Sequence, residues 1–486
     1  MVFSSLIFLY AFFPLCMLAY ACCPGLKAKN MCLLLFSLLF YTWGEPKYVL
    51  LLMFMALSSW FFALRVERAR EKRAAKGWVA AACGVDLALI GFFKYSGLVC
   101  SVFGPVPAFV RNIALPIGIS FYTFQLLTYV VDVYRGESKA QRNYLNVLLY
   151  AALFHQCIAG PIVRYNTLEQ ELFVRRGTEE LLPGISRFSI GLAKKTLLAN
   201  PCGALADSLL LADKTASDAA QFSANLEMLG ALPVLGAWLG VLAFMLQIYL
   251  DFSAYSDMAI GMGQMLGLHY PENFNYPYIS RSVTEFWRRW HITLSAFFRD
   301  YVYIPLGGNR RSRLRNGFNL LVVWALTGLW HGASWNFVLW GLWFFVFIGA
   351  ERLFLRKALD KLPAAFSHLY LLAVVFLGWI LFRFTDIRLG FAVFLGLFGA
   401  NGNPLSDFTV VTLLKNNLFL ILVCLAACTP LLKGLGQRLE SLGRTRPGLE
   451  RARELAVYAV VPVILLLLST AALVGDSYNP FIYFQF

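Results

Sequence analysis

One long apolar stretch, Phe318 to Ala350, constrains this chain most, because His331 is the only ionisable side chain between its ends. A membrane-spanning helix needs about 20 apolar residues, so the stretch is long enough to cross a bilayer. An ionisable side chain at membrane depth is costly and is kept mainly where it faces a cavity, a partner or a reaction. Burial also favours the neutral imidazole that a general base needs. We therefore favour a functional His331 over a packing histidine that hydrogen-bonds across helices.

The composition predicts an integral membrane protein. Hydrophobic residues make up 59% of the 486 residues and charged residues 14%, whereas soluble proteins carry about 25% charged residues. No stretch is both long and polar enough for a soluble domain, so we expect an all-α, polytopic protein with a single domain, 1–486. The net charge of +15 comes from basic residues in short loops, which suits membrane orientation and anionic lipid and argues against a nucleic-acid partner. The ten cysteines include no C-x-x-C pair, so neither a disulfide framework nor a metal site is expected.

The apolar runs predict the topology. Spans or part-spans are expected at 3–24, 31–43, 48–64, 78–100, 113–134, 144–162, 187–212, 230–269, 318–350, 367–384, 416–432 and 455–474. The basic loop 65–76 belongs in the cytoplasm by the positive-inside rule, which leaves both termini outside the cytoplasm. Segment 278–309 is amphipathic and too charged for a simple span, so a re-entrant or interfacial course is expected.

Two carboxylates also fall within apolar runs, Asp251 and Asp257. Their spacing of six residues does not place them on one helical face, where neighbours are three, four or seven residues apart. We therefore expect each to bind a neighbouring helix rather than to work as an acid–base pair.

Two motifs then match a known family. The segments PENFNYPYISRSVTEFWRRWHITLSAFFRDYVYIPLGGNR (271–310) and GLWHGASWNFVLWGLW (328–343) resemble the membrane-bound O-acyltransferase family, in particular its alginate O-acetylation branch. The block CIAGPIVRY (157–165), the opening MVFSS and the ending NPFIYFQF fit the same branch. The likeness therefore runs along nearly the whole chain.

The resemblance implies a fold and a reaction. The fold would be a ring of about 10–12 transmembrane and re-entrant helices around a central funnel. The enzyme would carry acetyl from cytoplasmic acetyl-CoA across the membrane to an exported or cell-wall polysaccharide (alginate-like, cellulose-like or peptidoglycan), with no permanently bound cofactor. The family's central histidine falls on His331 and its second motif histidine on His291. His155 stands where family members more often have proline, which argues against a required role.

Four arginines are candidate donor-binding residues, since guanidinium groups suit the phosphates of coenzyme A. They are Arg288, Arg289, Arg299 and Arg310. The alternative for each is anchoring at the cytoplasmic face together with pairing to Glu285 or Asp300. His291 is likewise open between a role in the donor funnel and a structural hydrogen bond. The remaining histidines rank low, with His269 at the end of a run and His368 expected in a solvated loop.

The tail 475–486 is expected outside the cytoplasm and ends in F-x-Y-x-x-F, in which the tyrosine is Tyr483. It resembles the end of the small membrane partner in teichoic acid D-alanylation, whose tyrosine is proposed to carry an acyl group. Tyr483 is thus a candidate transient acyl carrier that would need His331 as its base. The alternative is an aromatic interfacial anchor.

The resemblance implies an extracytoplasmic acetyltransferase partner, membrane lipids around the chain and a polysaccharide acceptor. Three other functions stay open from the sequence. D-alanyl transfer to teichoic acid is the rival within the enzyme class. A transporter or flippase would use intramembrane ionisable groups for ion coupling. A non-catalytic assembly protein would only dock a secreted transferase.

Overall fold

The computed structural model describes residues 2–70, 72–174, 180–211, 219–443, 447–475 and 478. The described residues form helices joined by short connections and contain no β-strand. They divide into two compact units, one made of 1–191 and 255–272, the other of 192–254 and 273–486. The prediction of one domain over 1–486 stays a prediction.

Seven helical segments are long and apolar enough to cross a membrane. They are Val49–Arg68, Ala74–Phe103, Val234–Met265, Trp335–Leu359, Ala364–Arg383, Phe408–Ala427 and Gly448–Gly475. This confirms the prediction of an all-α, multi-pass membrane protein. The expected first span is shorter than predicted, since its apolar helix covers only Phe8–Cys22.

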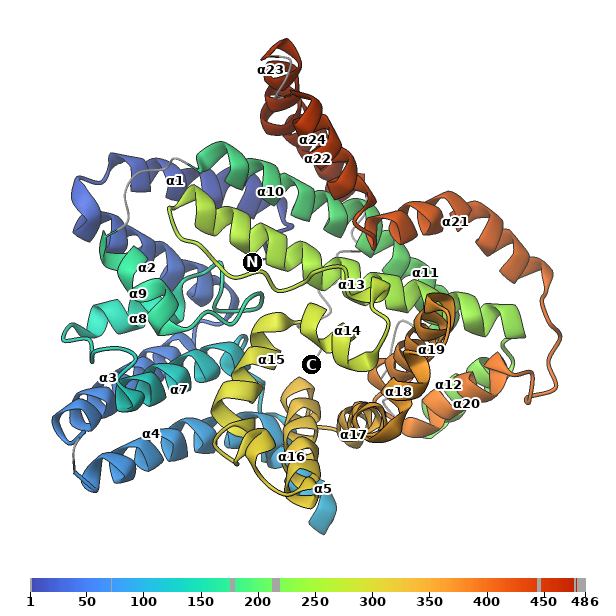
Figure 1. Ribbon diagram of the computed structural model, residues 1–486, viewed down its shortest axis with the longest axis horizontal. Coiled ribbons are helices and arrows are strands. Elements are labelled where there is room, and N and C mark those ends of the chain that lie inside the picture. Colours follow the sequence, from blue (N-terminus) through green and yellow to red (C-terminus); the bar gives the residue numbers. More distant parts are fainter. Residues whose placement is uncertain are drawn as a thin grey trace. The chain divides into compact units, whose positions relative to one another are not determined.

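The first unit contains the N-terminal helices (Figure 1). Its helices are α1 (Phe13–Cys22), α2 (Gly25–Gly44), α3 (Val49–Arg68), α4 (Ala74–Ile90), α5 (Ser96–Phe103), α6 (Ala108–Arg111), α7 (Ile119–Arg135), α8 (Tyr144–Ala152), α9 (Tyr165–Val174) and α10 (Leu181–Ala193), with the last part of α13. Helices α3, α4 and α7 pack side by side, and α8 packs on α2 and α3.

The predicted span 144–162 is wrong in its second half. Helix α8 ends at Ala152, and the segment 153–163 is irregular yet buried. The backbone leaves the helical region at Leu153, with a ψ of 112°, and Gly160, with a φ of +99°, precedes Pro161, so no single helix can run on to 162. Several polar groups of the segment are paired within the unit: the Tyr150 hydroxyl donates to the Val163 carbonyl at 2.8 Å, and Gln156 Nε2 donates to the Tyr150 carbonyl at 2.8 Å. Irregular backbone at membrane depth is tolerated under such cover.

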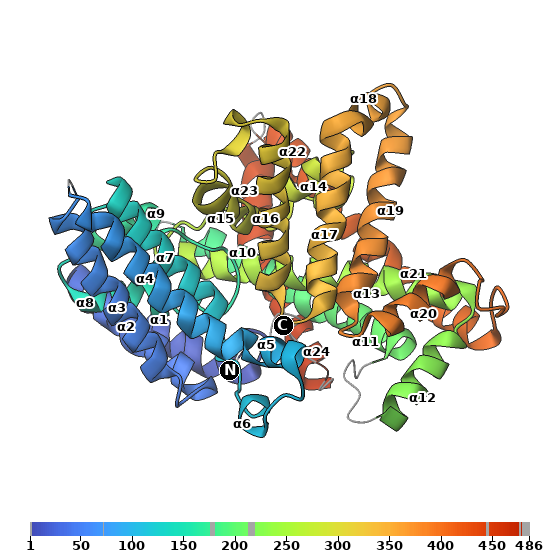
Figure 2. The same ribbon diagram turned by 90° about the horizontal axis from the view of Figure 1, so that it is seen from below.

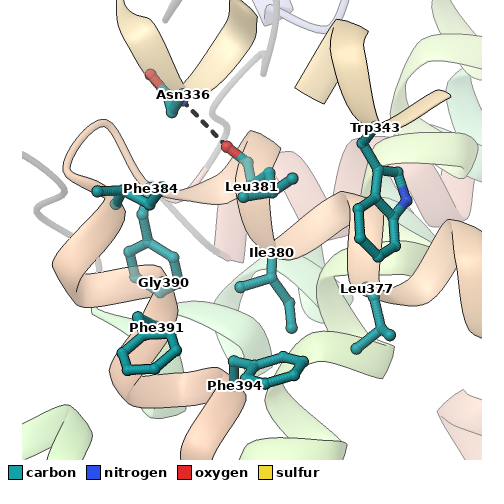
Figure 3. Close-up of a pocket in the computed structure, with 10 residues that line it drawn as sticks. Asn336, Trp343, Leu377, Ile380, Leu381, Phe384, Gly390, Phe391 and Phe394 are labelled. Carbon is teal, nitrogen blue, oxygen red and sulfur yellow. Dashed lines mark hydrogen bonds between the residues drawn. The ribbon is translucent and has the colours of Figure 1, made fainter. Parts of the chain in front are cut away.

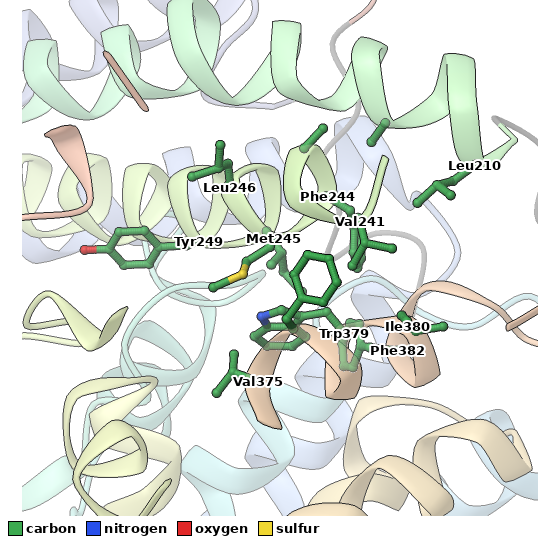
Figure 4. Packing of buried hydrophobic residues seen from close by; sticks show 14 of the residues in the cluster. Leu210, Val241, Phe244, Met245, Leu246, Tyr249, Val375, Trp379, Ile380 and Phe382 are labelled. Carbon is green, nitrogen blue, oxygen red and sulfur yellow. The ribbon is translucent and has the colours of Figure 1, made fainter. Parts of the chain in front are cut away.

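The second unit holds the remaining helices. They are α11 (Asn200–Leu210), α12 (Ala219–Gly230), α13 (Val234–Met265), α14 (Val283–Arg289), α15 (Ile292–Phe298), α16 (Arg313–His331), α17 (Trp335–Ala350), α18 (Arg356–Leu359), α19 (Ala364–Arg383), α20 (Ile387–Leu397), α21 (Phe408–Ala427), α22 (Leu431–Gly443), α23 (Pro447–Leu455) and α24 (Val461–Gly475). Figure 2 shows α16, α17 and α19 standing side by side. In the core of the second unit, the face of α13 that carries Phe244 packs against Trp379 and Phe382 of α19 (Figure 4).

The stretch 318–350 is two helices rather than one span. Helix α16 ends at His331, the backbone turns through 332–334, and α17 begins at Trp335. Glycine and serine favour helix ends, so the break falls at Gly332 and Ser334. The two helices cross closely, because a Cβ on Gly328 would collide with the Phe337 carbonyl. His331 therefore sits at a helix end, beside a turn, and not in the middle of a span.

Candidate active site

His331 is buried, with 4% of its surface exposed, among aromatic rings of the second unit. Its imidazole centre lies 4.9 Å from the ring of Trp330, 4.9 Å from that of Trp340 and 5.3 Å from that of Phe382, each close to edge-on. These rings come from α16, α17 and α19, the three helices that pack together there. Packed aromatic rings exclude water, so the imidazole lies in an apolar setting that favours its neutral form.

His291 also lies near Trp330. The Trp330 ring is 5.7 Å from the His291 imidazole, and the Phe252 ring is 4.7 Å from it. One indole thus contacts both predicted histidines. The structure therefore brings His291 and His331 into one aromatic cluster of the second unit, although the sequence separates them by two helices.

The tautomer of His291 follows from its neighbour Asn273. The backbone N–H of Thr293 donates to Asn273 Oδ1 at 3.3 Å, and the Thr293 hydroxyl donates to the same atom at 2.9 Å. An atom that accepts a backbone N–H must be the amide oxygen, so the His291 Nδ1 at 3.1 Å donates to it as well. The lone pair of His291 then lies on Nε2.

The backbone at His291 is unusual. Its φ is +44°, in the left-handed region, where it forms the N-cap of α15. Such a residue costs roughly 1–3 kcal/mol unless its surroundings hold it. The adjoining Ile292 N–H donates to the Asn273 carbonyl at 3.0 Å, and the Asn275 N–H donates to the Arg289 carbonyl at 2.9 Å. These bonds tie 273–275 to the turn and fix the direction of the imidazole.

The four candidate arginines differ in their surroundings. Arg289 binds Glu285 at 2.9 Å and Arg299 binds Asp300 at 2.6 Å, as in the alternative that the sequence allowed. Arg288 and Arg310 are exposed. The expected amphipathic segment is confirmed as short helices, α14 and α15, rather than one span.

The other ionisable candidates are paired. Asp251 binds Lys195 at 2.8 Å in the second unit, and Asp257 binds Arg187 at 2.8 Å in the first. Both therefore tie neighbouring helices, as their spacing predicted. The prediction that His368 lies in a solvated loop is wrong, because His368 lies half-buried in the first turns of α19. Tyr483 lies outside the described residues.

Two features escaped the sequence analysis. The first is Arg383, which ends the apolar helix α19 and is buried against Asp207. Its place within the apolar run FLGWILFRF could have indicated a buried, paired arginine. Asn273 had no such signal, since a lone asparagine in a polar loop is unremarkable in sequence.

An apolar groove of about 210 Å³ lies beside the cluster, between α17, α19 and α20 (Figure 3). Asn336 closes one side, where its Nδ2 donates to the Leu381 carbonyl at 3.1 Å. Phe391 and Phe394 also line the groove and are exposed. None of the lining residues is a predicted site residue, so the groove is not the predicted reaction centre.

Comparisons with known proteins give the family context. The sequence model of the membrane-bound O-acyltransferase family matches residues 33–394. The chain is 34% identical to the probable alginate O-acetylase AlgI of Azotobacter vinelandii over the full length of both. It is 31% identical to the peptidoglycan O-acetyltransferase of Helicobacter pylori, over 83% of this chain and 80% of that protein. It is 30% identical to the teichoic acid D-alanyltransferase of Bacillus subtilis, over 50% of this chain and 60% of that protein.

Proposed function

Because the chain belongs to the membrane-bound O-acyltransferase family, we propose that it is an O-acetyltransferase that serves an exported or cell-wall polysaccharide. The donor would be acetyl-CoA on the cytoplasmic side. The observation that carries the proposal is His331 buried at the end of α16, walled by the rings of Trp340 and Phe382.

The chemistry needs one base. His331 takes the proton of an attacking hydroxyl, whose oxygen forms an ester bond with the thioester carbonyl carbon. The carbon–sulfur bond breaks, and the proton passes from His331 to the departing thiolate of coenzyme A. A neutral imidazole among apolar rings suits this proton transfer. His291, held by Asn273, would orient the donor or the proton from its place beside Trp330.

The first acceptor in this proposal is the Tyr483 hydroxyl. A phenol with an ordinary pKa near 10 needs a base at neutral pH, and His331 supplies it. We further propose that the tail lies outside the cytoplasm, as the basic loop 65–76 predicts, so that an acylated tail would present acetyl to an extracytoplasmic acetyltransferase partner. That partner would transfer it to the polysaccharide. Arg288 and Arg310, being exposed, would bind the phosphates of the donor.

Two alternatives fit less well. The teichoic acid D-alanyltransferase resembles only half of this chain, whereas the O-acetylating relatives cover 83% or more of it. A transporter would use free intramembrane carboxylates for ion coupling. Asp251 and Asp257 are instead each paired with a basic side chain.

The test uses purified protein in detergent with acetyl-CoA labelled in the acetyl group. We expect release of free coenzyme A and an acetyl group on the peptide that contains Tyr483. The His331→Ala variant should lose both by about 10²–10⁴-fold, the usual contribution of a general base. His368→Ala, which alters a histidine of α19 away from the cluster, is the matched control. Undiminished cleavage by His331→Ala would overturn the assignment of the base.

Two further outcomes would change the identity of the first acceptor or the role of the protein. Cleavage that depends on His331 but leaves the tail unlabelled would move the first acceptor from Tyr483 to another hydroxyl. Polymer acetylation in cells that survives His331→Ala would instead support a non-catalytic assembly role.

A further inference from the structure

A buried charge cluster lies at the end of α19, around Arg383. The Arg383 side chain is 2% exposed, and its Nη2 donates to Asp207 Oδ1 and to the Leu211 carbonyl, each at 2.5 Å. Its guanidinium also lies over the Phe244 ring, 5.1 Å from the centroid. A buried guanidinium needs such partners, because an unpaired one costs several kcal/mol.

The second carboxylate oxygen of Asp207 has a different partner. It accepts a hydrogen bond at 2.5 Å from the hydroxyl of Tyr478, which lies three residues beyond the end of α24 at Gly475. Asp207 thus joins the end of α19 to Tyr478, near the start of the tail 475–486. A hydrogen bond to an ionised group is stronger than one between neutral groups.

Helix α11 is shaped to admit that hydroxyl. Gly203 lies one turn before Asp207, on the same face of α11, since residues four apart are neighbours on a helix. A Cβ on Gly203 would lie 2.9 Å from the Tyr478 hydroxyl and would collide with the Gln247 side chain. The missing side chain therefore leaves a space that the Gln247 amide and the Tyr478 hydroxyl share. Gly203 and Asp207 together form a socket.

The socket is linked to the candidate base through one helix end. Arg383 directly follows Phe382, whose ring lies 5.3 Å from the His331 imidazole. Tyr483 lies five residues after Tyr478, a stretch that can span at most about 17 Å when fully extended. Tyr478 is therefore linked, through Asp207 and Arg383, to the helix end that contacts His331.

We propose that Asp207 and Gly203 form a socket for Tyr478 that positions the C-terminal segment for acylation of its terminal tyrosine. The inference rests on the proposed transfer of acetyl to Tyr483. Tyr478, Asp207 and Gly203 are positioning residues, so they act on the rate at which the tail is acylated and leave the donor's own binding unchanged.

The test compares the full-length wild type with Tyr478→Phe and with Gly203→Ala, which fills the socket. Tyr458→Phe, in the preceding helical segment, is the matched control for a tyrosine hydroxyl. We follow acetylation of the terminal peptide by mass spectrometry at several acetyl-CoA concentrations. Release of C-terminal residues by carboxypeptidase reports how firmly the tail is held.

Loss of one hydrogen bond to a charged group, worth about 1.5–3 kcal/mol, should slow tail acetylation by about ten- to a hundredfold. In Tyr478→Phe and Gly203→Ala the maximal rate should fall, the KM for acetyl-CoA should stay at the wild-type value and carboxypeptidase should act faster. Tyr458→Phe should match the wild type.

Two outcomes overturn the socket, and they are distinguishable. A labelled tail with equal rates in wild type and both socket variants removes the socket and leaves the transfer to Tyr483 standing. An unlabelled tail in the wild type removes the transfer to Tyr483 and the socket's proposed role with it.

Discussion

The imidazole of His331 lies edge-on to the indole of Trp340, with 4.9 Å between ring centres. The two residues come from α16 and α17, on either side of the turn 332–334. The turn thus brings a histidine from one helix end against an aromatic ring one turn into the next helix. The position of that ring depends on how closely the two helices cross.

The crossing of α16 and α17 should be sensitive to a single methyl group. A Cβ on Gly341 would collide with the Trp324 carbonyl oxygen and lie 3.3 Å from Gly328 Cα. We expect Gly341→Ala to destabilise the protein by about 1–3 kcal/mol, the usual cost of overpacking. Thermal unfolding in detergent measures it, with acyl transfer as a second readout.

The control for that substitution lies in the same helix. A Cβ on Gly349 meets no atom within 4 Å, so Gly349→Ala should be neutral or stabilise by up to about 1 kcal/mol through helix propensity. Equal stability of the two variants would show that the crossing is not as tight as its geometry indicates.

The tautomer of His291 should depend on Asn273. Asn273→Leu removes the acceptor of Nδ1 and of the Thr293 N–H, so we expect about a tenfold or greater fall in kcat. Asn273→Asp keeps an acceptor oxygen and should retain most of the activity. The measurement is coenzyme A release at saturating donor. If leucine and aspartate behave alike, the asparagine does not act through the imidazole.

The candidate arginines should differ in how much each contributes to binding of the acetyl-CoA donor. Exposed Arg288 and Arg310 are available to phosphate, so changing either to glutamine should raise the KM for acetyl-CoA several-fold, with little change in kcat. The effect should shrink as salt is added. Arg299→Gln should do less, because Arg299 already binds Asp300.

A surface arginine elsewhere is the control for these variants. Arg388 is exposed and binds Asp386 at the start of α20. Arg388→Gln should leave the KM unchanged. A KM that is the same for all four variants and the wild type would mean that the phosphates are bound by other groups.

The loop after α13 should make stability depend on pH. Burial alone would lower the pKa of His269, but hydrogen bonds and charges from Glu171 at 2.8 Å and Glu180 at 3.3 Å outweigh it and raise the pKa. A group with a raised folded-state pKa stabilises below its unfolded pKa of about 6.5, and loses that contribution as pH rises through the folded value.

We therefore expect His269→Gln to lower the melting temperature slightly at pH 6 and not at pH 9. The effect should be small because the pair is solvent-exposed. Glu171→Gln should remove most of the same pH dependence. A difference from the wild type that grows towards pH 9 would contradict the ion pair.

The sequence alone determined the features that depend on composition and local pattern. Long apolar runs specify helices in a membrane wherever they fall, because unpaired backbone groups in lipid are prohibitive. Family motifs located His331 and His291, and the six-residue spacing of Asp251 and Asp257 was enough to predict separate partners, which the structure confirms as Lys195 and Arg187.

Only the tertiary structure decided what depends on contacts between distant segments. Hydropathy does not register a break inside an apolar run, so the turn after His331 and the end of α8 at Ala152 were missed. The contact of one indole with both histidines, and the bond from Tyr478 to Asp207, join residues that are far apart in the chain. Such pairings arise from packing and from the need to satisfy buried charges, which no local pattern encodes.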